Sequence, residues 1–97
     1  AYFFYVMQAM QEAAVEEGLS GEIAKTLTLQ TALGAIQLAL QSEKELMSLK
    51  NQVTSPGGTT EAALAVLDVN KVSETIKHAI SAARKRAKTL SEDLDKN

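Results

Sequence analysis

A chain of 97 residues forms one small domain, and a domain of this size covers its own apolar surface poorly without a partner subunit. The formal charge of -2, from 10 Lys and Arg against 12 Asp and Glu, gives no field that would gather nucleic acid or anionic lipid. The sequence has no cysteine, which excludes disulfides and thiolate metal sites and permits a reducing compartment, the cytoplasm. Neither nucleic acid nor a membrane is an expected partner.

The chain begins at Ala1 in the middle of an apolar helical pattern, without a cap or a basic flank, so we interpret it as a fragment. This apolar opening is too short to span a bilayer. The uncharged run from Thr26 to Ser42 is interrupted by several polar side chains. Neither segment is predicted to be a membrane helix.

The first two predicted helices occupy the N-terminal half. The first covers about Tyr2 to Glu17, with apolar residues at helical spacing, and ends at Gly18. The second follows Ser20, which can cap it, and is apolar on almost every side. We expect this second helix to be buried on most sides, with Gly34 allowing another backbone to come close.

The sequence after Ser42 predicts three more helices. Ser42 and Glu45 have capping-box spacing, which favours a third helix from about Glu43 to Gln52. Its apolar residues, predicted to face inward, are Leu46, Leu49 and Val53.

A fourth helix, about Thr60 to Leu67, is mostly Ala, Leu and Val and is expected in the core, with Asn70 as a left-handed stop. The last helix runs from about Lys71 to Leu94 and carries one apolar stripe. At roughly 36 Å it is longer than the domain needs, which favours contact with a neighbour. No segment has strand periodicity, so the predicted fold class is all-α with about five helices.

A glycine-rich turn, Pro56-Gly57-Gly58, joins the third helix to the fourth. Pro56 fixes one backbone angle, the two glycines permit angles closed to other residues, and Thr59 or Thr60 can cap the helix that follows. Because the first amides of a helix have no internal acceptor, a small carboxylate or phosphate would gain hydrogen bonds and a favourable dipole here. By itself, such a turn is more often a plain capped junction.

Three other features favour structural roles. His78 is the only histidine, and without cysteine it predicts no metal site. The basic run at 84–88 is followed by acidic residues and is interpreted as a solvated helix face. The four adjacent aromatic residues at 2–5 cover all sides of a helix, which favours burial at an interface over base stacking.

The run from Leu49 to Asp68 resembles the signature of pyrroline-5-carboxylate reductase, in which a hydrophobic residue leads into Thr-Ser-Pro-Gly-Gly-x-Thr and a helix of small residues. Further segments in register with this family are Ala1-Tyr2-Phe3, Glu12-Ala13-Ala14, Gly18-Leu19, Gln30 and Gly34. The departures are Leu46 where many members have Pro, Asn51 where Asp is common, and Asn70-Lys71 where a Gly-Gly turn is usual.

The resemblance implies that residues 1–97 are the C-terminal helical domain of a two-domain enzyme, interlocked with a second subunit in a homodimer or a larger assembly of dimers. This enzyme reduces 1-pyrroline-5-carboxylate to L-proline with NADPH or NADH. The cofactor is bound mainly by an N-terminal Rossmann domain, and the chain has no Gly-x-Gly-x-x-Gly after a strand. The fragment alone is therefore expected to bind no cofactor and to be inactive.

The resemblance also implies where the substrate binds, with its carboxylate at the turn 57–60. The predicted substrate-binding residues are Ser55, Gly57, Gly58, Thr59, Thr60 and Glu43. Thr60 matches a family threonine whose hydroxyl lies near the ring nitrogen, so it is the predicted catalytic residue, acting by orientation. Gln52 falls where a family residue can touch the cofactor.

Two other interpretations remain open at this point. The chain could be a non-catalytic helical dimerisation module, in which the apolar second and last helices carry the function. It could also belong to a related reductase of another cyclic imino acid, because the turn would recognise a carboxylate and a ring nitrogen rather than the substituents of the ring.

Overall fold

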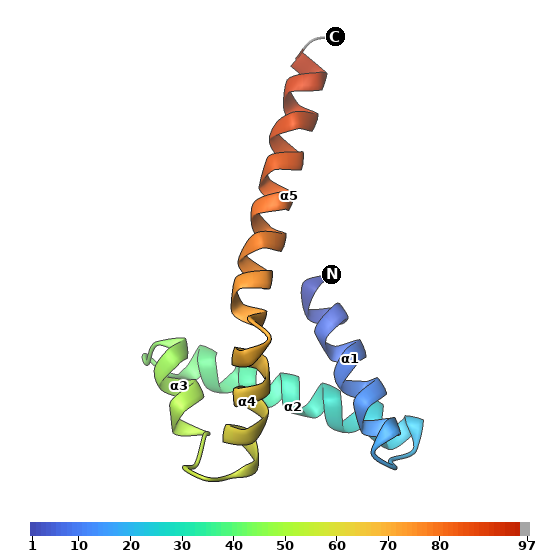
Figure 1. Ribbon diagram of the computed structural model, residues 1–97, viewed down its shortest axis with the longest axis vertical. Helices are drawn as coiled ribbons and strands as arrows, with labels where there is room; N and C mark the ends of the chain where they lie inside the picture. Colours follow the sequence, from blue (N-terminus) through green and yellow to red (C-terminus); the bar gives the residue numbers. More distant parts are fainter. Residues whose placement is uncertain (96–97) are drawn as a thin grey trace. The chain divides into compact units, whose positions relative to one another are not determined.

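The computed structural model describes residues 1–95, so Lys96 and Asn97 of the predicted domain 1–97 lie outside the described residues. The described part contains five helices and no strand (Figure 1), which confirms the all-α prediction. The helices are α1 (Tyr2–Glu16), α2 (Gly21–Gln41), α3 (Leu46–Gln52), α4 (Thr59–Val69) and α5 (Val72–Asp95). The chain divides into two compact units, Ala1–Leu49 and a second unit that begins at Lys50.

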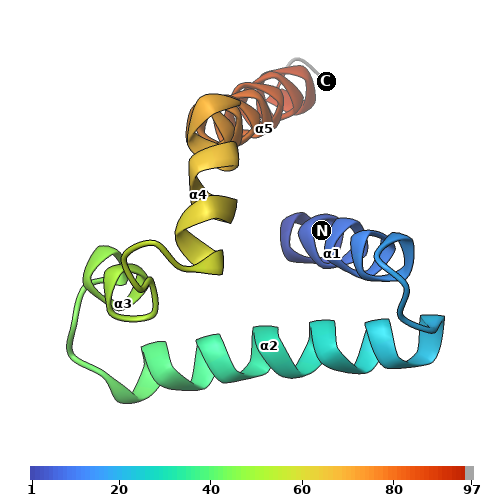
Figure 2. The same cartoon turned by 60° about the horizontal axis from the view of Figure 1, so that its bottom comes forward.

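In the first unit, α1 packs against α2 and is joined to it by a tight turn at Gly18 (Figure 2). Gly18 has a φ of 110°, and its N–H donates to the Val15 carbonyl at 3.0 Å. The N–H of Leu19 donates to the Ala14 carbonyl at 3.0 Å. These two bonds form a Schellman motif, which a glycine in a left-handed conformation allows. The predicted helix end at Gly18 is confirmed.

The start of α2 is also as predicted, but its burial is not. The Ser20 Oγ accepts a hydrogen bond from the Ile23 N–H at 3.3 Å and caps the helix. Only Ala24 and Thr28 of α2 are buried. The prediction that α2 is buried on most sides is therefore wrong for the single chain, because α1 covers only one narrow face of it. Large apolar side chains of α2 that remain exposed include Leu27, Leu33, Ile36 and Leu40.

By length and composition alone, α2 is the one helix among residues 1–95 that could cross a membrane. This test is weak for a single helix, because an apolar helix from the core of a soluble protein passes it as well. The sequence-based expectation that α2 is not a membrane helix stays a prediction.

The start of α3 differs from the prediction. The Ser42 N–H donates to the Leu38 carbonyl at 3.0 Å, and the Ser42 Oγ accepts from the Lys44 N–H at 3.0 Å. Ser42 therefore ends α2 and closes a short turn, where the sequence predicted a capping box with Glu45. As a result α3 begins at Leu46, three residues after the predicted start at Glu43.

The inward face of α3 is only partly confirmed. Leu49 is buried, whereas Leu46 and Val53 are exposed. Leu46 is the first helical residue of α3, a position at which proline is favoured. Because leucine is also a good helix former, the departure from the proline of the resembled family leaves a regular helix.

In the second unit, α4 packs against α5. The expectation that α4 lies in the core is wrong for the single chain, because α4 contains no buried residue among those described and only Leu64 is half-buried. The apolar pattern of α4 is real, but most of its apolar side chains are exposed, including Val66, Leu67 and Val69.

The turn between α4 and α5 places its left-handed residue one position later than predicted. Asn70 has a φ of -88°, and Lys71 has a φ of 55°. The Asn70 side-chain amide donates to the Val66 carbonyl at 2.9 Å, and its backbone N–H donates to the same carbonyl at 3.1 Å. Asn70 thereby extends the end of α4 in a right-handed conformation, and the chain reverses at Lys71.

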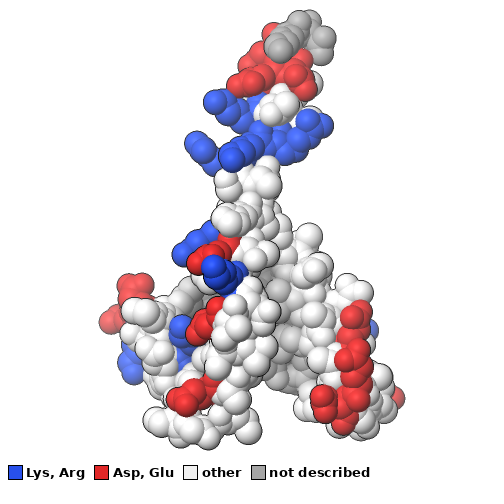
Figure 3. Space-filling view, viewed as in Figure 1, with Lys and Arg blue, Asp and Glu red and all other residues white. Residues whose placement is uncertain are grey.

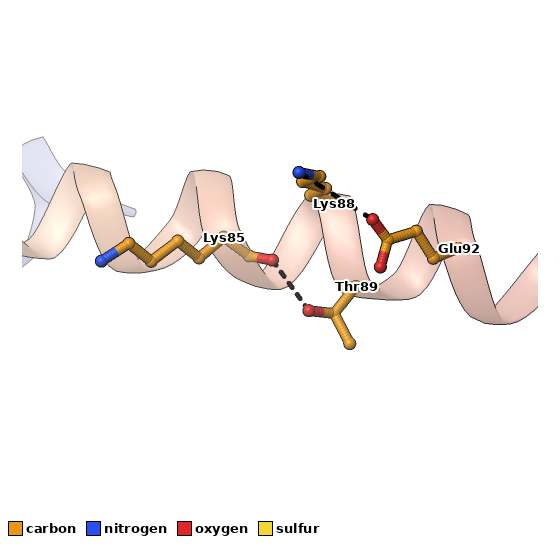
Figure 4. Close-up of polar contacts among 4 residues, drawn as sticks. All are labelled: Lys85, Lys88, Thr89 and Glu92. Carbon is orange, nitrogen blue, oxygen red and sulfur yellow. Dashed lines mark hydrogen bonds and ion pairs between the residues drawn. The ribbon is translucent and has the colours of Figure 1, made fainter.

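The long helix α5 is amphipathic, with an exposed basic band followed by an acidic band toward its C-terminal end (Figure 3). The Nζ of Lys88 lies 4.0 Å from the Oε1 of Glu92, and the Thr89 hydroxyl donates to the Lys85 carbonyl at 3.0 Å (Figure 4). These contacts stay within one exposed helix face, which agrees with the interpretation of the basic run as a solvated face.

Candidate functional site

The glycine-rich segment between α3 and α4 forms a type II β-turn. The Gly58 N–H donates to the Ser55 carbonyl at 3.1 Å, Pro56 is the second residue and Gly57, with a φ of 72°, is the third. A type II turn requires a positive φ at its third residue, which explains Gly57. Glycine is favoured at position 58 for a different reason, since a Cβ there would make a tight contact of 3.2 Å with the Ser55 carbonyl oxygen.

Thr54 fastens this turn to the end of α3. Its backbone N–H donates to the Asn51 carbonyl at 3.1 Å, and its hydroxyl donates to the Lys50 carbonyl at 2.6 Å. Both carbonyls lie in the last turn of α3, where the helix itself supplies no donor. These two hydrogen bonds therefore hold the start of the turn against the last turn of α3.

The amides that follow Pro56 fall into two groups. Those of Gly57 and Gly58 are engaged, the first by the Oε1 of Glu61 at 3.2 Å and the second by Ser55. The amides of Thr59, Thr60 and Glu61 have no acceptor within residues 1–95, and the next N–H, that of Ala62, donates to the Gly58 carbonyl. Three unpaired donors therefore lie together at the exposed start of α4.

The prediction that Thr59 or Thr60 caps this helix is wrong. The cap residue of α4 is Gly58, which has no side chain, and the two threonines are the first and second helical residues. Their side chains are exposed, and neither hydroxyl has a hydrogen-bond partner in the described part of the chain. The start of α4 thus presents two hydroxyls beside three unpaired amides.

The predicted site residues are only partly gathered in one place. Ser55, Gly57, Gly58, Thr59 and Thr60 lie in one continuous turn of the second unit. Glu43 is exposed between α2 and α3 in the first unit, and Gln52 is the last residue of α3. The binding roles assigned to these residues stay predictions.

Sequence reasoning missed Glu61 as part of the turn. Its carboxylate reaches back from the third helical residue to the Gly57 amide. A glutamate at the third position of a helix that follows a turn is the available signal, because this side chain often accepts from an amide before the helix.

The second unit also has a shallow groove of about 340 Å³, which contains none of the predicted site residues. Its lining residues are Lys50, Leu64, Leu67, Asp68, Val72, Ser73, Ile76 and Lys77. Within residues 1–95 there is no group of three or more His, Asp or Glu side chains that could hold a metal ion.

Comparison with known proteins places this helical fold and its turn in one family. The family model described as pyrroline-5-carboxylate reductase dimerisation matches residues 1–90. The chain belongs to this family. The helices and the turn at Pro56 to Thr60 all lie in the matched range, apart from the last residues of α5.

Individual relatives carry the same name. The chain is 51% identical over 94 residues to a pyrroline-5-carboxylate reductase of Pseudomonas aeruginosa, and 44% identical over 94 residues to pyrroline-5-carboxylate reductase 2 of Bacillus subtilis. In both alignments 97% of this chain covers 34% of the relative. The chain thus spans about a third of the length of the curated relatives it matches.

Solved structures of pyrroline-5-carboxylate reductases also resemble this chain in fold. A pyrroline-5-carboxylate reductase from Coxiella burnetii matches 92% of this chain with a TM-score of 0.87 and 48% identity, over 33% of its own chain. A pyrroline carboxylate reductase from Plasmodium falciparum, solved with NADP bound, matches 84% of this chain with a TM-score of 0.82 and 34% identity, over 32% of its own chain.

Proposed function

We propose that the full-length protein containing this chain reduces 1-pyrroline-5-carboxylate to L-proline with NADPH or NADH in the cytoplasm. In this proposal the chain supplies the C-terminal dimerisation domain and the turn that binds the substrate carboxylate. The observation that carries it is the set of three unpaired amides at the start of α4, in a chain whose relatives are named for this reaction.

The amides of Thr59, Thr60 and Glu61 suit a carboxylate because they are fixed donors at the positive end of a helix dipole. A hydrogen bond to a charged group contributes about 1.5–3 kcal/mol, so two or three of them hold a small substrate firmly in one orientation. Binding by backbone amides also leaves the nearby hydroxyls available for the ring.

Thr60 is the residue proposed to act closest to the reacting bond. A nicotinamide cofactor, bound mainly outside this chain, would supply hydride for the carbon of the C=N bond, and the ring nitrogen would need a proton. The Thr60 hydroxyl has no partner among the described residues and lies one residue into the helix that binds the carboxylate. These two features support a role in which the Thr60 hydroxyl hydrogen-bonds the ring nitrogen and fixes the orientation of the ring.

Replacement of Thr60 by Ala tests this role in the full-length enzyme. We expect kcat/KM for 1-pyrroline-5-carboxylate to fall about tenfold, because loss of one oriented hydrogen bond costs about 1–1.5 kcal/mol. Thr60→Ser should restore most of the activity.

Thr89→Ala is the matched control, since the Thr89 hydroxyl bonds only within exposed α5. Unchanged turnover and unchanged proline affinity in Thr60→Ala would contradict the assigned role. Steady-state kinetics with five- and six-membered cyclic imino acids would separate this reductase from one that acts on another ring.

The homodimer is the second part of the proposal. The family is named for dimerisation, and the single chain leaves the apolar side chains of α2, α4 and α5 largely exposed. A second copy that covers these side chains supplies the burial that one small chain lacks. Burial by a second copy would explain why α2 and α4 have the apolar pattern of core helices although most of their apolar side chains are exposed in the single chain.

A further inference from the structure

We propose that Glu61 is a positioning residue that fixes the orientation of the Pro56–Gly57 peptide and thereby shapes the carboxylate site at the start of α4. This inference rests on the proposed function and adds to it a residue outside the predicted site. The carrying observation is the hydrogen bond from the Gly57 N–H to the Glu61 Oε1 at 3.2 Å.

The turn needs such a determinant because its sequence permits two geometries. Type I and type II turns differ mainly by a flip of the central peptide, here the bond between Pro56 and Gly57. Proline is compatible with the second position of both, and glycine can adopt either sign of φ at the third. The Pro-Gly sequence alone therefore does not determine the observed φ of 72° at Gly57.

Glu61 favours the type II geometry over the type I geometry. A type II turn leaves the N–H of its third residue without a partner inside the turn, since the closing bond runs from Gly58 to Ser55. The Glu61 carboxylate accepts that N–H, and a bond to a charged acceptor is stronger than one between neutral groups. A flipped peptide would point the Pro56 carbonyl toward this carboxylate, which is unfavourable because both carry negative charge.

The orientation matters to the substrate because the turn is packed closely against the helix start. Gly58 is the cap residue of α4, and a Cβ built on it would lie 3.2 Å from the Ser55 carbonyl oxygen, a tight contact. A flip at Gly57 therefore moves the residues that directly precede the unpaired amides of Thr59 and Thr60. It also brings a carbonyl oxygen into the neighbourhood of a bound carboxylate.

The test compares Glu61→Ala with Glu61→Gln in the full-length enzyme. Glutamine keeps an oxygen acceptor at the same reach, whereas alanine removes it. We expect Glu61→Ala to raise KM for 1-pyrroline-5-carboxylate and Kd for L-proline about tenfold, the effect of one lost 1.4 kcal/mol contribution. We expect kcat to change less than about twofold, KM for the cofactor to stay constant, and Glu61→Gln to recover most of the loss.

Glu74→Ala is the matched control, because Glu74 also lies in the first turn of a helix, α5, without reaching back to a turn amide. Glu74→Ala should leave the KM for 1-pyrroline-5-carboxylate and the Kd for L-proline unchanged. An unchanged substrate KM in Glu61→Ala overturns the proposal. Tighter binding in both Glu61 variants also overturns it, because the carboxylate would then be competing with the substrate for the Gly57 amide.

Hydrogen exchange of the Gly57 amide separates this inference from the proposed function. Exchange should be faster in Glu61→Ala than in the wild type and close to wild type in Glu61→Gln. If the wild-type enzyme reduces no cyclic imino acid, the proposed function fails. In that case equal exchange in all three proteins would still show that Glu61 does not hold the turn.

Discussion

At the scale of single residues, three positive φ angles shape the backbone of residues 1–95: those of Gly18, Gly57 and Lys71. Glycine adopts such angles readily, whereas a residue with a Cβ is strained by about 1–2 kcal/mol. Lys71 is therefore the costly position, and it stands where the resembled family usually has a Gly-Gly turn. Its carbonyl accepts both the N–H and the hydroxyl of Thr75, at 3.0 and 3.1 Å, which helps to hold the start of α5.

Gly18 gives a direct prediction at this scale. Gly18→Ala should destabilise the protein by about 1–2 kcal/mol, because its φ of 110° is unfavourable for any residue with a Cβ. No atom lies within 4 Å of the added methyl group, so backbone strain alone accounts for the effect. Thermal unfolding of the full-length protein measures it.

Gly21→Ala is the control for Gly18→Ala. Gly21 is the first residue of α2, has no positive φ and likewise has open space around an added Cβ. It should be neutral or slightly stabilising. Equal melting temperatures for the two variants would contradict the role given to the Schellman motif.

At the scale of helices and turns, the boundaries that the sequence predicted correctly depend on local bonding. The Ser20 cap and the Gly18 stop each involve a few adjacent residues, so their residue types are sufficient signals. Ser42 failed as a signal because its hydroxyl can accept from either of two nearby amides, and the structure uses that of Lys44. Asn70 failed as a signal because its side chain bonds back to Val66 while its φ stays at -88°, and the left-handed angle falls on Lys71 instead.

In the candidate turn, too, some features could be predicted from residue types and others could not. Its position at Pro56, Gly57 and Gly58 follows from residue types, since proline is favoured at the second position of both type I and type II turns and glycine accepts either geometry at the third. Which amides stay unpaired does not follow, because α4 begins at Thr59 and because Glu61 adopts a conformation that reaches Gly57. Burial was the least predictable property, because an apolar pattern shows that a face will be covered but not by which chain.

Gly34 provides the prediction for α2. In the single chain no atom lies within 4 Å of a Cβ added at Gly34, so alanine should stabilise an isolated α2 by about 0.8–1 kcal/mol. If a second backbone approaches this face in the proposed dimer, Gly34→Ala should instead lower the melting temperature and weaken dimerisation, measured by sedimentation.

Lys25→Ala serves as the control in the same helix, since lysine and alanine are both good helix formers and Lys25 is exposed. It should change the melting temperature little. A rise in stability for Gly34→Ala, with no loss of dimer, would show that no backbone packs closely at this position.

At the scale of the whole molecule, the helices hold little core of their own. The buried residues among 1–95 are Ala24, Thr28 and Leu49, and no large side chain is fully buried. Such a chain buries too little apolar surface to offset the entropy of ordering its backbone. In the proposed homodimer a second copy would supply the missing burial. This chain covers 34% of its curated relatives, so further residues of the proposed full-length protein would contribute to its stability as well.

The most direct test of this account is a crystal structure of the full-length protein with L-proline bound. We expect the proline carboxylate oxygens to lie within about 3.2 Å of the backbone nitrogens of Thr59, Thr60 and Glu61, in a dimer that covers α2. Proline bound elsewhere, with these three amides unpaired or paired to protein acceptors, would contradict it.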